Sequence, residues 1–567
     1  MKAGDPRRGT SIGYGYAVEP LPASPSLLTL RDRLDRIVLY QVYPQSFADA
    51  DGDGMGDLDG IAARLDYLSW LGVDAVWINP CFVSPMRDAG YDVADFDHVD
   101  PRYGGDAALE RLVAAADARG IAIVLDLVAG HTSDRHPWFL ASVDDPDDSR
   151  YVWSPEAAPG FVAGPGVRGG FYKPNFFEFQ PALNFGYART DPAEPWRQPV
   201  DADGPRQNRD ALVEIISRWY DRGVQGFRVD MAASLVKDDP GHVETGRLWA
   251  EVRSRLDARH PGNILISEWG DPAKAVPAGF DVDFFLQFGG DDDGAPLKSL
   301  WNNGAGTVHE AWGEPRAWAD ASGAGDASYF IDAWRRATAA IADAGSTGIP
   351  GLPTANHDFT RLVAGDRDAV QARSALLLAL TWPALPSIYY GDEIGMRYVP
   401  GLDSLEGSSL GPTYERAGSR TPMQWGELPG SVPVAHESRY LPQDPDPLRP
   451  TVADQLDDPD SLLRFVRAAI ALRRSDERLS ARGPVEVRST GYPFVFTRGS
   501  LLVALNPSAT SREVDLARTT PDLATPGPAL AGKLGEERVR LAFGAEVADG
   551  ILRLEAFGCA VVDLAPA

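Results

Sequence analysis

The chain has 567 residues, of which 44% are hydrophobic and 24% are charged, and its formal net charge is −27 at pH 7. This length exceeds what one compact core organises, so we expect about two or three domains. The acidic balance argues against nucleic acid or an anionic membrane as a partner, because both bind basic surfaces.

Cysteine content and hydropathy narrow the class of protein further. The chain has two cysteines, Cys81 and Cys559, which predict neither a disulfide framework nor a cysteine metal site. There is no run of about 18 apolar residues, and residues 1–25 lack the apolar core of a secretion signal. We therefore expect a cytoplasmic protein that does not enter a membrane.

Apolar strands and amphipathic helices alternate along most of the chain, after an N-terminal segment (1–30) that we expect to be extended. The expected strands span 36–44, 74–80, 121–130, 226–233, 263–269, 280–287, 351–358 and 387–395, and the expected helices span 58–72, 106–120, 208–222, 243–258, 327–344, 368–380 and 460–480. Such alternation indicates a parallel sheet, and about eight units of this kind predict an α/β fold, the (β/α)8 TIM barrel.

Two regions depart from this alternation. Residues 132–205 are rich in Pro, Gly and aromatic residues without a clear period, which predicts an inserted irregular subdomain. Residues 483–567 contain short apolar runs typical of antiparallel strands, which predict a C-terminal β domain. The catalytic barrel is then expected over 31–131 and 206–482.

Polar residues gather where the expected strands end, which is where barrel enzymes carry their chemistry. Arg228 and Asp230 lie two apart on one strand, so they should point to the same side. They could form a structural salt bridge or an acid kept ionised by its arginine. Several such groups are hard to explain by stability, because buried unpaired charge is expensive. The set comprises Asp126, His131, Arg228, Asp230, Glu268, His357 and Asp358.

Two carboxyl groups across a pocket are the minimum for glycoside hydrolysis. Arg228 should lower the pKa of Asp230 and keep it anionic, as a nucleophile requires. Glu268 lies among apolar neighbours next to Trp269, a setting that helps an acid catalyst hold its proton. The pair therefore predicts a nucleophile and a general acid.

Four ordered motifs carry a resemblance to a known family: "DLVAGHTSDRHPWF" (126–139), "GFRVD" (226–230), "SEWG" (267–270) and "ANHD" (355–358). Over roughly residues 36–480 the chain resembles the α-amylase superfamily of retaining α-glycoside hydrolases, in its α-glucosidase/oligo-1,6-glucosidase branch. The resemblance implies Asp230 as nucleophile, Glu268 as general acid/base and Asp358 as the carboxylate that stabilises the transition state. It implies Tyr91, His131, Arg228 and His357 as ligands of the innermost sugar.

The resemblance also implies a closed substrate pocket. Asp88 and Arg420 match a family pair that grips the outer hydroxyls of a terminal glucose. Such a pair predicts action at the chain end of short oligosaccharides or disaccharides. The alternative is an ordinary surface ion pair, which would contribute little.

An acidic loop, "DADGDGMGD" (49–57), suits an oxygen-rich Ca²⁺ shell. The matching family loop binds Ca²⁺ or Mg²⁺, which implies a structural metal site at Asp49, Asp51, Asp53, Asp57 and the carbonyl of Met55. An acidic turn without metal is the alternative, and no organic cofactor is expected.

The motifs depart from the family pattern at two places. In the first motif, Ala129 and Gly130 stand where the family has Pro and Asn. That asparagine supports the site, so the local loop or the orientation of His131 is open. Met231 stands where the branch often has Val for α-1,6 links and Ala or Thr for α-1,4 links, and the absence of Val tips the expectation towards α-1,4.

The leading hypothesis is an exo-acting retaining α-glucosidase with an α-glucoside oligosaccharide or disaccharide as substrate. A transglucosidase or isomerase, similar to trehalose synthase or isomaltulose synthase, would use the same covalent intermediate. A non-catalytic binding or transporter-subunit relative is a third hypothesis, opposed by the presence of all three acids. The sequence does not indicate the oligomeric state.

Overall fold

The computed structural model describes residues 28–287, 295–301, 316–405, 416–427, 436–516 and 538–564. Of the expected N-terminal segment, residues 1–27 lie outside the described residues. Among the helices in these ranges, none combines the length and the apolar character needed to cross a membrane.

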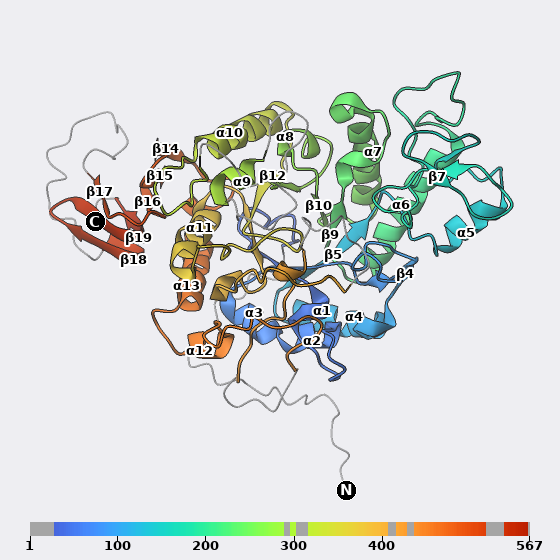
Figure 1. The fold of residues 1–567 in the computed structure, drawn as a ribbon. Coiled ribbons are helices and arrows are strands. Elements are labelled where there is room, and N and C mark those ends of the chain that lie inside the picture. The colour runs from blue at the N-terminus through green and yellow to red at the C-terminus, as the bar shows by residue number, and fades with distance from the viewer. Residues whose placement is uncertain are drawn as a thin grey trace, which may run out of the picture.

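Within the described residues, eight parallel strands close into a barrel in the spatial order β1-β13-β12-β11-β10-β9-β5-β2 (Figure 1). This confirms the predicted (β/α)8 barrel. The strands are β1 (Leu39–Val42), β2 (Ala75–Ile78), β5 (Ala122–Val128), β9 (Gly226–Asp230), β10 (Ile264–Ser267), β11 (Val282–Phe284), β12 (Ile349–Pro353) and β13 (Leu385–Tyr389).

Helices surround the barrel and connect its strands (Figure 1). They are α1 (Pro44–Phe47), α2 (Leu58–Ala63), α3 (Leu65–Leu71), α4 (Gly105–Asp117), α5 (Pro137–Asp144), α6 (Asp203–Asp221), α7 (Val243–Arg259), α8 (Pro272–Ala275), α9 (Pro296–Trp301), α10 (Ser328–Asp343), α11 (Ala369–Thr381), α12 (Val452–Leu456) and α13 (Leu462–Ser475). Short 3₁₀ helices span Pro101–Tyr103, Ala232–Ser234, Pro240–His242, Asp392–Ile394, Ala417–Ser419 and Glu477–Leu479. The local sequence determines where several helices begin. For example, Asp368 and Gln371 form a capping box at the start of α11.

Most strands are shorter than the sequence predicts, because polar turns follow their buried cores. The strand expected over 387–395 ends at Tyr389, since Gly391 adopts a left-handed φ of 86° and opens a 3₁₀ helix. The helix expected over 58–72 is two helices that meet at Arg64.

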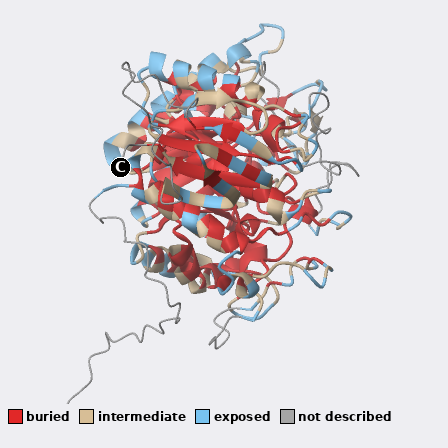
Figure 2. Ribbon diagram, turned by 90° about the vertical axis from the view of Figure 1, so that its left-hand side faces the viewer, coloured by how far each residue is buried: buried red, intermediate tan, exposed pale blue. Residues whose placement is uncertain are grey.

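The barrel strands divide their side chains between two cores. One apolar cluster includes Ala122 and Val124 of β5 with Ile264 and Ile266 of β10. Ile123 and Leu125, which alternate with Ala122 and Val124 along β5, belong to a second cluster that packs under the helices. This alternation is the period of two expected for a strand. Figure 2 shows that buried residues concentrate in the centre of the molecule.

The inserted segment and the C-terminal sheet lie at opposite ends of the molecule in the view of Figure 1. The segment contains a small sheet of β6 (Trp153–Ser154), β8 (Phe171–Tyr172) and β7 (Val162–Ala163), while β3 (Phe82–Val83) pairs with β4 (Asp95–Val99).

The C-terminal sheet has the order β14-β15-β16-β19-β17, and β18 pairs with β19. Its strands are β14 (Glu486–Ser489), β15 (Phe494–Arg498), β16 (Leu501–Leu505), β17 (Arg512–Asp515), β18 (Val539–Ala548) and β19 (Ile551–Asp563). The predicted antiparallel β domain is confirmed. The boundaries expected at residues 132, 206 and 483 stay predictions.

Candidate active site

The end of β9 places Arg228 and Asp230 on the same side, as the strand period predicts. Arg228 lies in register with Asp126 of the neighbouring β5, and its Nη1 is 2.8 Å from Asp126 Oδ1. The same Nη1 is 3.2 Å from Asp230 Oδ1. All three side chains are buried. Burial raises the pKa of Asp126 to about 6, against the attraction of Arg228.

A strained turn after β9 brings Glu268 to the same guanidinium. Met231 adopts a left-handed φ of 45°, which is uncommon for a residue with a side chain. Its backbone N–H donates to Glu268 Oε2 over 3.1 Å. Arg228 Nη2 lies 2.7 Å from Glu268 Oε1. One guanidinium therefore contacts three acids, Asp126, Asp230 and Glu268.

The carboxyl groups of Asp230 and Glu268 compete for the single positive charge of Arg228. Burial and the negative Glu268 raise the pKa of Asp230 well above its usual value, although Arg228 acts in the opposite direction. Arg228 does lower the pKa of Asp230, as the sequence predicts, but burial and Glu268 outweigh it, so the net shift is upward. Hydrogen-bonding contact with Glu268 adds to the raised pKa of Asp230.

Asp358 follows β12 on another side of the barrel mouth and meets the opposite environment. Its Oδ1 lies 3.1 Å from Arg420 Nη2 and 3.4 Å from Arg416 Nη1, and its Oδ2 lies 3.2 Å from His357 Nε2. Burial alone would raise the pKa of Asp358, but His357 and the two arginines hold it well below its usual range. Asp358 is therefore an anion.

Asp88 joins this arginine cluster through a partner that the sequence did not suggest. Its Oδ1 lies 2.9 Å from Arg416 Nη2, and Gln180 Nε2 donates to its Oδ2 over 2.9 Å. Asp88 is thus ion-paired with Arg416. The expected role of Asp88 and Arg420 as ligands of a terminal glucose stays a prediction. The Asp88 and Arg416 side chains are only 9% and 8% exposed, so the alternative of an ordinary surface ion pair is wrong.

Tyr91 and His357 stack on each other beside Asp358. Their ring centroids are 5.5 Å apart at an angle of 7°, and Tyr91 Oη lies 2.8 Å from His357 Nε2. Tyr91 Oη also donates to Asp126 Oδ2 over 3.0 Å. The side-chain amides of Gln41 and Asn79 donate to His357 Nδ1. Burial lowers the pKa of His357 to about 3, against the attraction of Asp358.

His131 is held by protein groups at both ring nitrogens. Its Nε2 lies 2.9 Å from the backbone oxygen of Tyr91, and its Nδ1 lies 3.0 Å from Asn175 Nδ2. Burial lowers the pKa of His131 to about 4. Asn175 comes from the inserted segment, where no motif marked it, and neither Gln180 nor Arg416 was marked. Only tertiary contacts identify these three residues.

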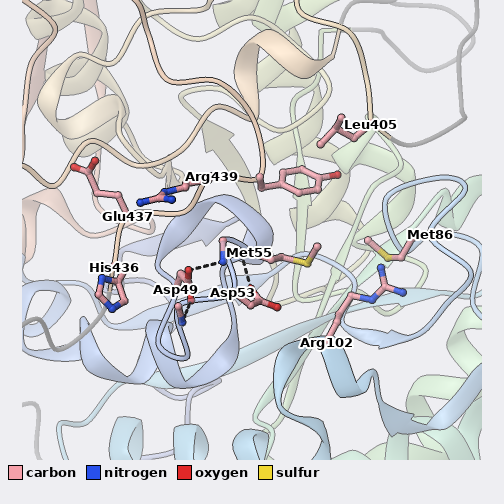
Figure 3. Close-up of a pocket in the computed structure, with 12 residues that line it drawn as sticks. Asp49, Asp53, Met55, Met86, Arg102, Leu405, His436, Glu437 and Arg439 are labelled. Atoms are coloured by element: carbon pink, nitrogen blue, oxygen red, sulfur yellow. Dashed lines mark hydrogen bonds between the residues drawn. The ribbon is translucent and has the colours of Figure 1, made fainter.

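The acidic loop forms a separate cluster beside a pocket of about 650 Å³ (Figure 3). Carboxylate oxygens of Asp49, Asp51 and Asp57 lie within 4.8 Å of one another. The N–H groups of Gly52 and Gly54 donate to Asp49, and Asp57 caps α2.

One of the four expected carboxylate ligands is not part of this cluster. Asp53 is absent from the group of converging carboxylates, and its Oδ1 accepts the N–H of Met55 over 2.7 Å. Three oxygen donors still suit a hard cation, so the donor set fits Ca²⁺ or Mg²⁺ in part.

The family profile described as "Alpha amylase, catalytic domain" matches residues 41–270 and 319–482. A probable alpha-glucosidase of Rhizobium meliloti is 30% identical over 94% of this chain and 98% of its own. The trehalose synthase/amylase TreS of Mycobacterium tuberculosis is 32% identical over 80% of this chain and 76% of its own. A palatinase of Erwinia rhapontici is 31% identical over 77% and 82%.

Solved structures agree at the level of the fold. A mutant of the trehalulose synthase MutB has a TM-score of 0.72 at 23% identity, covering 94% of this chain and 99% of its own. Amy13B of Eubacterium rectale has a TM-score of 0.70 at 22% identity, covering 95% and 100%. With the family match over both parts of the barrel, these similarities show that the chain belongs to the α-amylase family and is a glycoside hydrolase.

Proposed function

We propose that this protein is an exo-acting α-glucosidase that retains the anomeric configuration and acts on short oligosaccharides or disaccharides. The observation that carries the proposal is the contact of Asp230 and Glu268 around the single guanidinium of Arg228. Inverting enzymes leave roughly 6.5–9.5 Å between their carboxyl groups for a water molecule. Two carboxyl groups in hydrogen-bonding contact leave no such room.

The first step needs one carboxylate and one proton donor from this pair. Asp230 attacks the anomeric carbon as a carboxylate, while the proton passes through Glu268 to the glycosidic oxygen. The bond from the anomeric carbon to that oxygen breaks, the shortened sugar leaves, and the glucosyl group remains as an ester on Asp230. Arg228 balances the charge that stays behind.

The second step uses the same groups in reverse. Glu268 takes a proton from water, the resulting oxygen attacks the anomeric carbon, and Asp230 leaves as a carboxylate. The anionic Asp358 faces the positive charge that develops on the sugar in both steps. Two inversions give net retention.

The exo mode is supported by the buried cluster of Asp88, Arg416 and Arg420. These groups are arranged around Asp358 with almost no solvent exposure. Hydrogen-bonding groups at the closed end of a pocket suit the terminal hydroxyls of one sugar rather than a continuing chain.

We further propose a structural Ca²⁺ or Mg²⁺ in the acidic loop, held by Asp49, Asp51 and Asp57, whose carboxylates converge. The ion would supply positive charge that relieves repulsion among these acids. It has no part in the steps above.

The test is incubation of the purified protein with maltose, isomaltose, trehalose and sucrose separately, with time-resolved chromatography and NMR of the first product. We expect glucose from maltose, released first as the α-anomer. Release of β-glucose would overturn retention. No product from any of the four sugars would overturn the proposed activity on disaccharides.

A second candidate, transglucosylation or isomerisation, is favoured by the names of the similar proteins. TreS is a trehalose synthase/amylase, and one structure of MutB is described as a complex with its substrate sucrose. A new disaccharide that forms before glucose accumulates would assign the protein to this class.

A further inference from the structure

The loop after β5 lacks a side chain next to a residue of the proposed sugar site. Gly130 precedes His131, and its backbone does not require glycine, because its φ is not in the left-handed region. A Cβ placed on Gly130 would lie 3.6 Å from Asn175 Nδ2 and 3.5 Å from Leu235 Cδ2. The amide of Asn175 therefore borders the space that a longer side chain at position 130 would enter.

Hydrogen bonding determines which nitrogen of His131 carries the proton. The backbone oxygen of Tyr91 can only accept, so His131 Nε2, 2.9 Å away, must carry the hydrogen. Nδ1 of the neutral ring is then an acceptor. It needs a donor, and Asn175 Nδ2 lies 3.0 Å from it.

A half-buried lysine determines which way the amide of Asn175 points. Lys237 Nζ donates to the backbone oxygen of Ser234 over 2.7 Å and lies 3.5 Å from Asn175 Oδ1. A cation attracts the amide oxygen and repels the amide NH₂ group. The NH₂ group of Asn175 is thereby directed at His131.

We propose that Asn175, oriented by Lys237, is a positioning residue that fixes the tautomer and the ring orientation of His131 and so prepares the proposed sugar site. The inserted segment thus reaches into the barrel mouth and supplies there an amide that position 130 does not. The kinetic part of this proposal rests on the proposed glucosidase function. The part that concerns the tautomer of His131 does not depend on that function.

The backbone holds the inserted segment in place independently of this side chain. Leu183 N donates to Gly130 O over 3.0 Å, and Thr132 N donates to Pro181 O over 3.3 Å. The backbone N–H of Asn175 donates to Gln180 O over 2.8 Å. Truncating the Asn175 side chain should therefore leave the segment folded.

The first test is histidine ¹⁵N NMR of the full-length protein, with the His131 signals assigned by comparison with His131→Gln. The wild type should show an acceptor Nδ1 and a protonated Nε2. We expect Asn175→Ala to give a mixture of tautomers, and Asn175→Asp, which offers only an acceptor, to raise the pKa of His131. Unchanged His131 signals in both variants would overturn the positioning role.

The second test is kinetic. We expect Asn175→Ala to raise KM about 10-fold while kcat stays within about 3-fold, because a mispositioned binding group mainly weakens sugar binding. Adding Gly130→Asn to Asn175→Ala should recover part of KM and the single tautomer. Glu178→Gln, an exposed change in the same segment, is the matched control.

The two tests separate the two proposals. Tautomer changes in a protein that acts on no α-glucoside would support the positioning role and overturn the proposed function. A KM increase without any change in the His131 signals would support glucosidase activity and overturn the role of Asn175 as a positioning residue.

Discussion

Two sides of the barrel mouth hold the same kind of side chain in opposite electrostatic settings. At the ends of β9 and β10, Asp230 and Glu268 share one guanidinium, and the pKa of Asp230 is raised by burial and by its neighbour. Near the end of β12, Asp358 faces two guanidinium groups, and its pKa is held well below the usual range despite burial. Burial is common to both sides, so the ratio of acids to arginines decides the difference.

The difference assigns a chemical task to each side. Two acids around one guanidinium can divide the work, with one acting as the proton donor and the other as the nucleophile. An acid that stays ionised can only attract positive charge. The same residue type therefore serves in proton transfer at one place and in charge stabilisation at the other.

The largest expected effect follows from removing Asp230, the acid at the end of β9. We expect Asp230→Ala to lower kcat/KM roughly 10⁴-fold or more, because the covalent step is lost. The melting temperature should stay the same or rise, since one of two repelling acids is removed. Steady-state kinetics and calorimetry measure both.

Azide separates the roles of the two acids. In Asp230→Ala, azide should replace the nucleophile directly and give the β-glucosyl azide. In Glu268→Ala, azide should attack the covalent intermediate and give the α-glucosyl azide. The same anomer from both variants would contradict the assignment.

On the arginine-rich side, removing one cation should cost both activity and stability. Arg416→Met leaves Asp88 and Asp358 with less positive charge in a buried place. We expect kcat/KM to fall about 10²-fold and the free energy of unfolding to fall by about 3–5 kcal/mol. Urea unfolding measures the second effect.

Two further variants control for the loss of an arginine as such. Adding Asp88→Asn to Arg416→Met should restore part of the stability, because one unpaired buried charge is removed. Arg36→Met breaks a pair with Glu477 in which the two side chains are 52% and 79% exposed, and should cost less than about 1 kcal/mol. Equal losses from Arg36→Met and Arg416→Met would contradict the electrostatic explanation.

A third setting, an acid that has no arginine partner among the residues that the structure describes, adds a pH dependence. Asp283 of β11 is buried. Its Oδ1 accepts hydrogen bonds from Ser267 Oγ over 2.6 Å and from Trp269 N over 2.9 Å. Ser267 and Trp269 are the neighbours of Glu268 in the chain. Burial raises the pKa of Asp283 to about 8. The folded state then binds a proton that the unfolded state has released, so stability falls as pH rises from about 4 to about 8.

We expect Asp283→Asn to remove this dependence. Between pH 5 and pH 9 the wild type should lose about 3–5 kcal/mol of unfolding free energy relative to the variant. Calorimetry across this pH range measures the difference. A gap between the two proteins that stays constant with pH would show that Asp283 does not titrate there.

The smallest expected effect concerns the acidic loop. Among the described residues, no arginine pairs with its three converging carboxylates, those of Asp49, Asp51 and Asp57, so a bound cation would have to balance their charge. If a cation does so, a chelator should lower the melting temperature by about 2–4 °C, and added Ca²⁺ should restore it. Asp51→Asn should reduce this sensitivity while leaving kcat nearly unchanged. A melting temperature that changes with neither the chelator nor Ca²⁺ would favour the acidic turn without metal.

The sequence by itself determined the barrel, the C-terminal sheet and the residues that gather at the mouth. Local patterns suffice for these features, because strand and helix periods report which faces are buried and motif order reports which strand ends meet. The spacing of Arg228 and Asp230 correctly placed both on one side of β9.

Only the tertiary structure decided which charges meet and how they titrate. The pKa of Asp230 depends on Glu268, and the partner of Asp88 is Arg416, which is 328 residues away. The amide at His131 comes from Asn175 in a segment without any period. Electrostatic energies depend on distance in space and on burial, and neither can be read from separation along the chain.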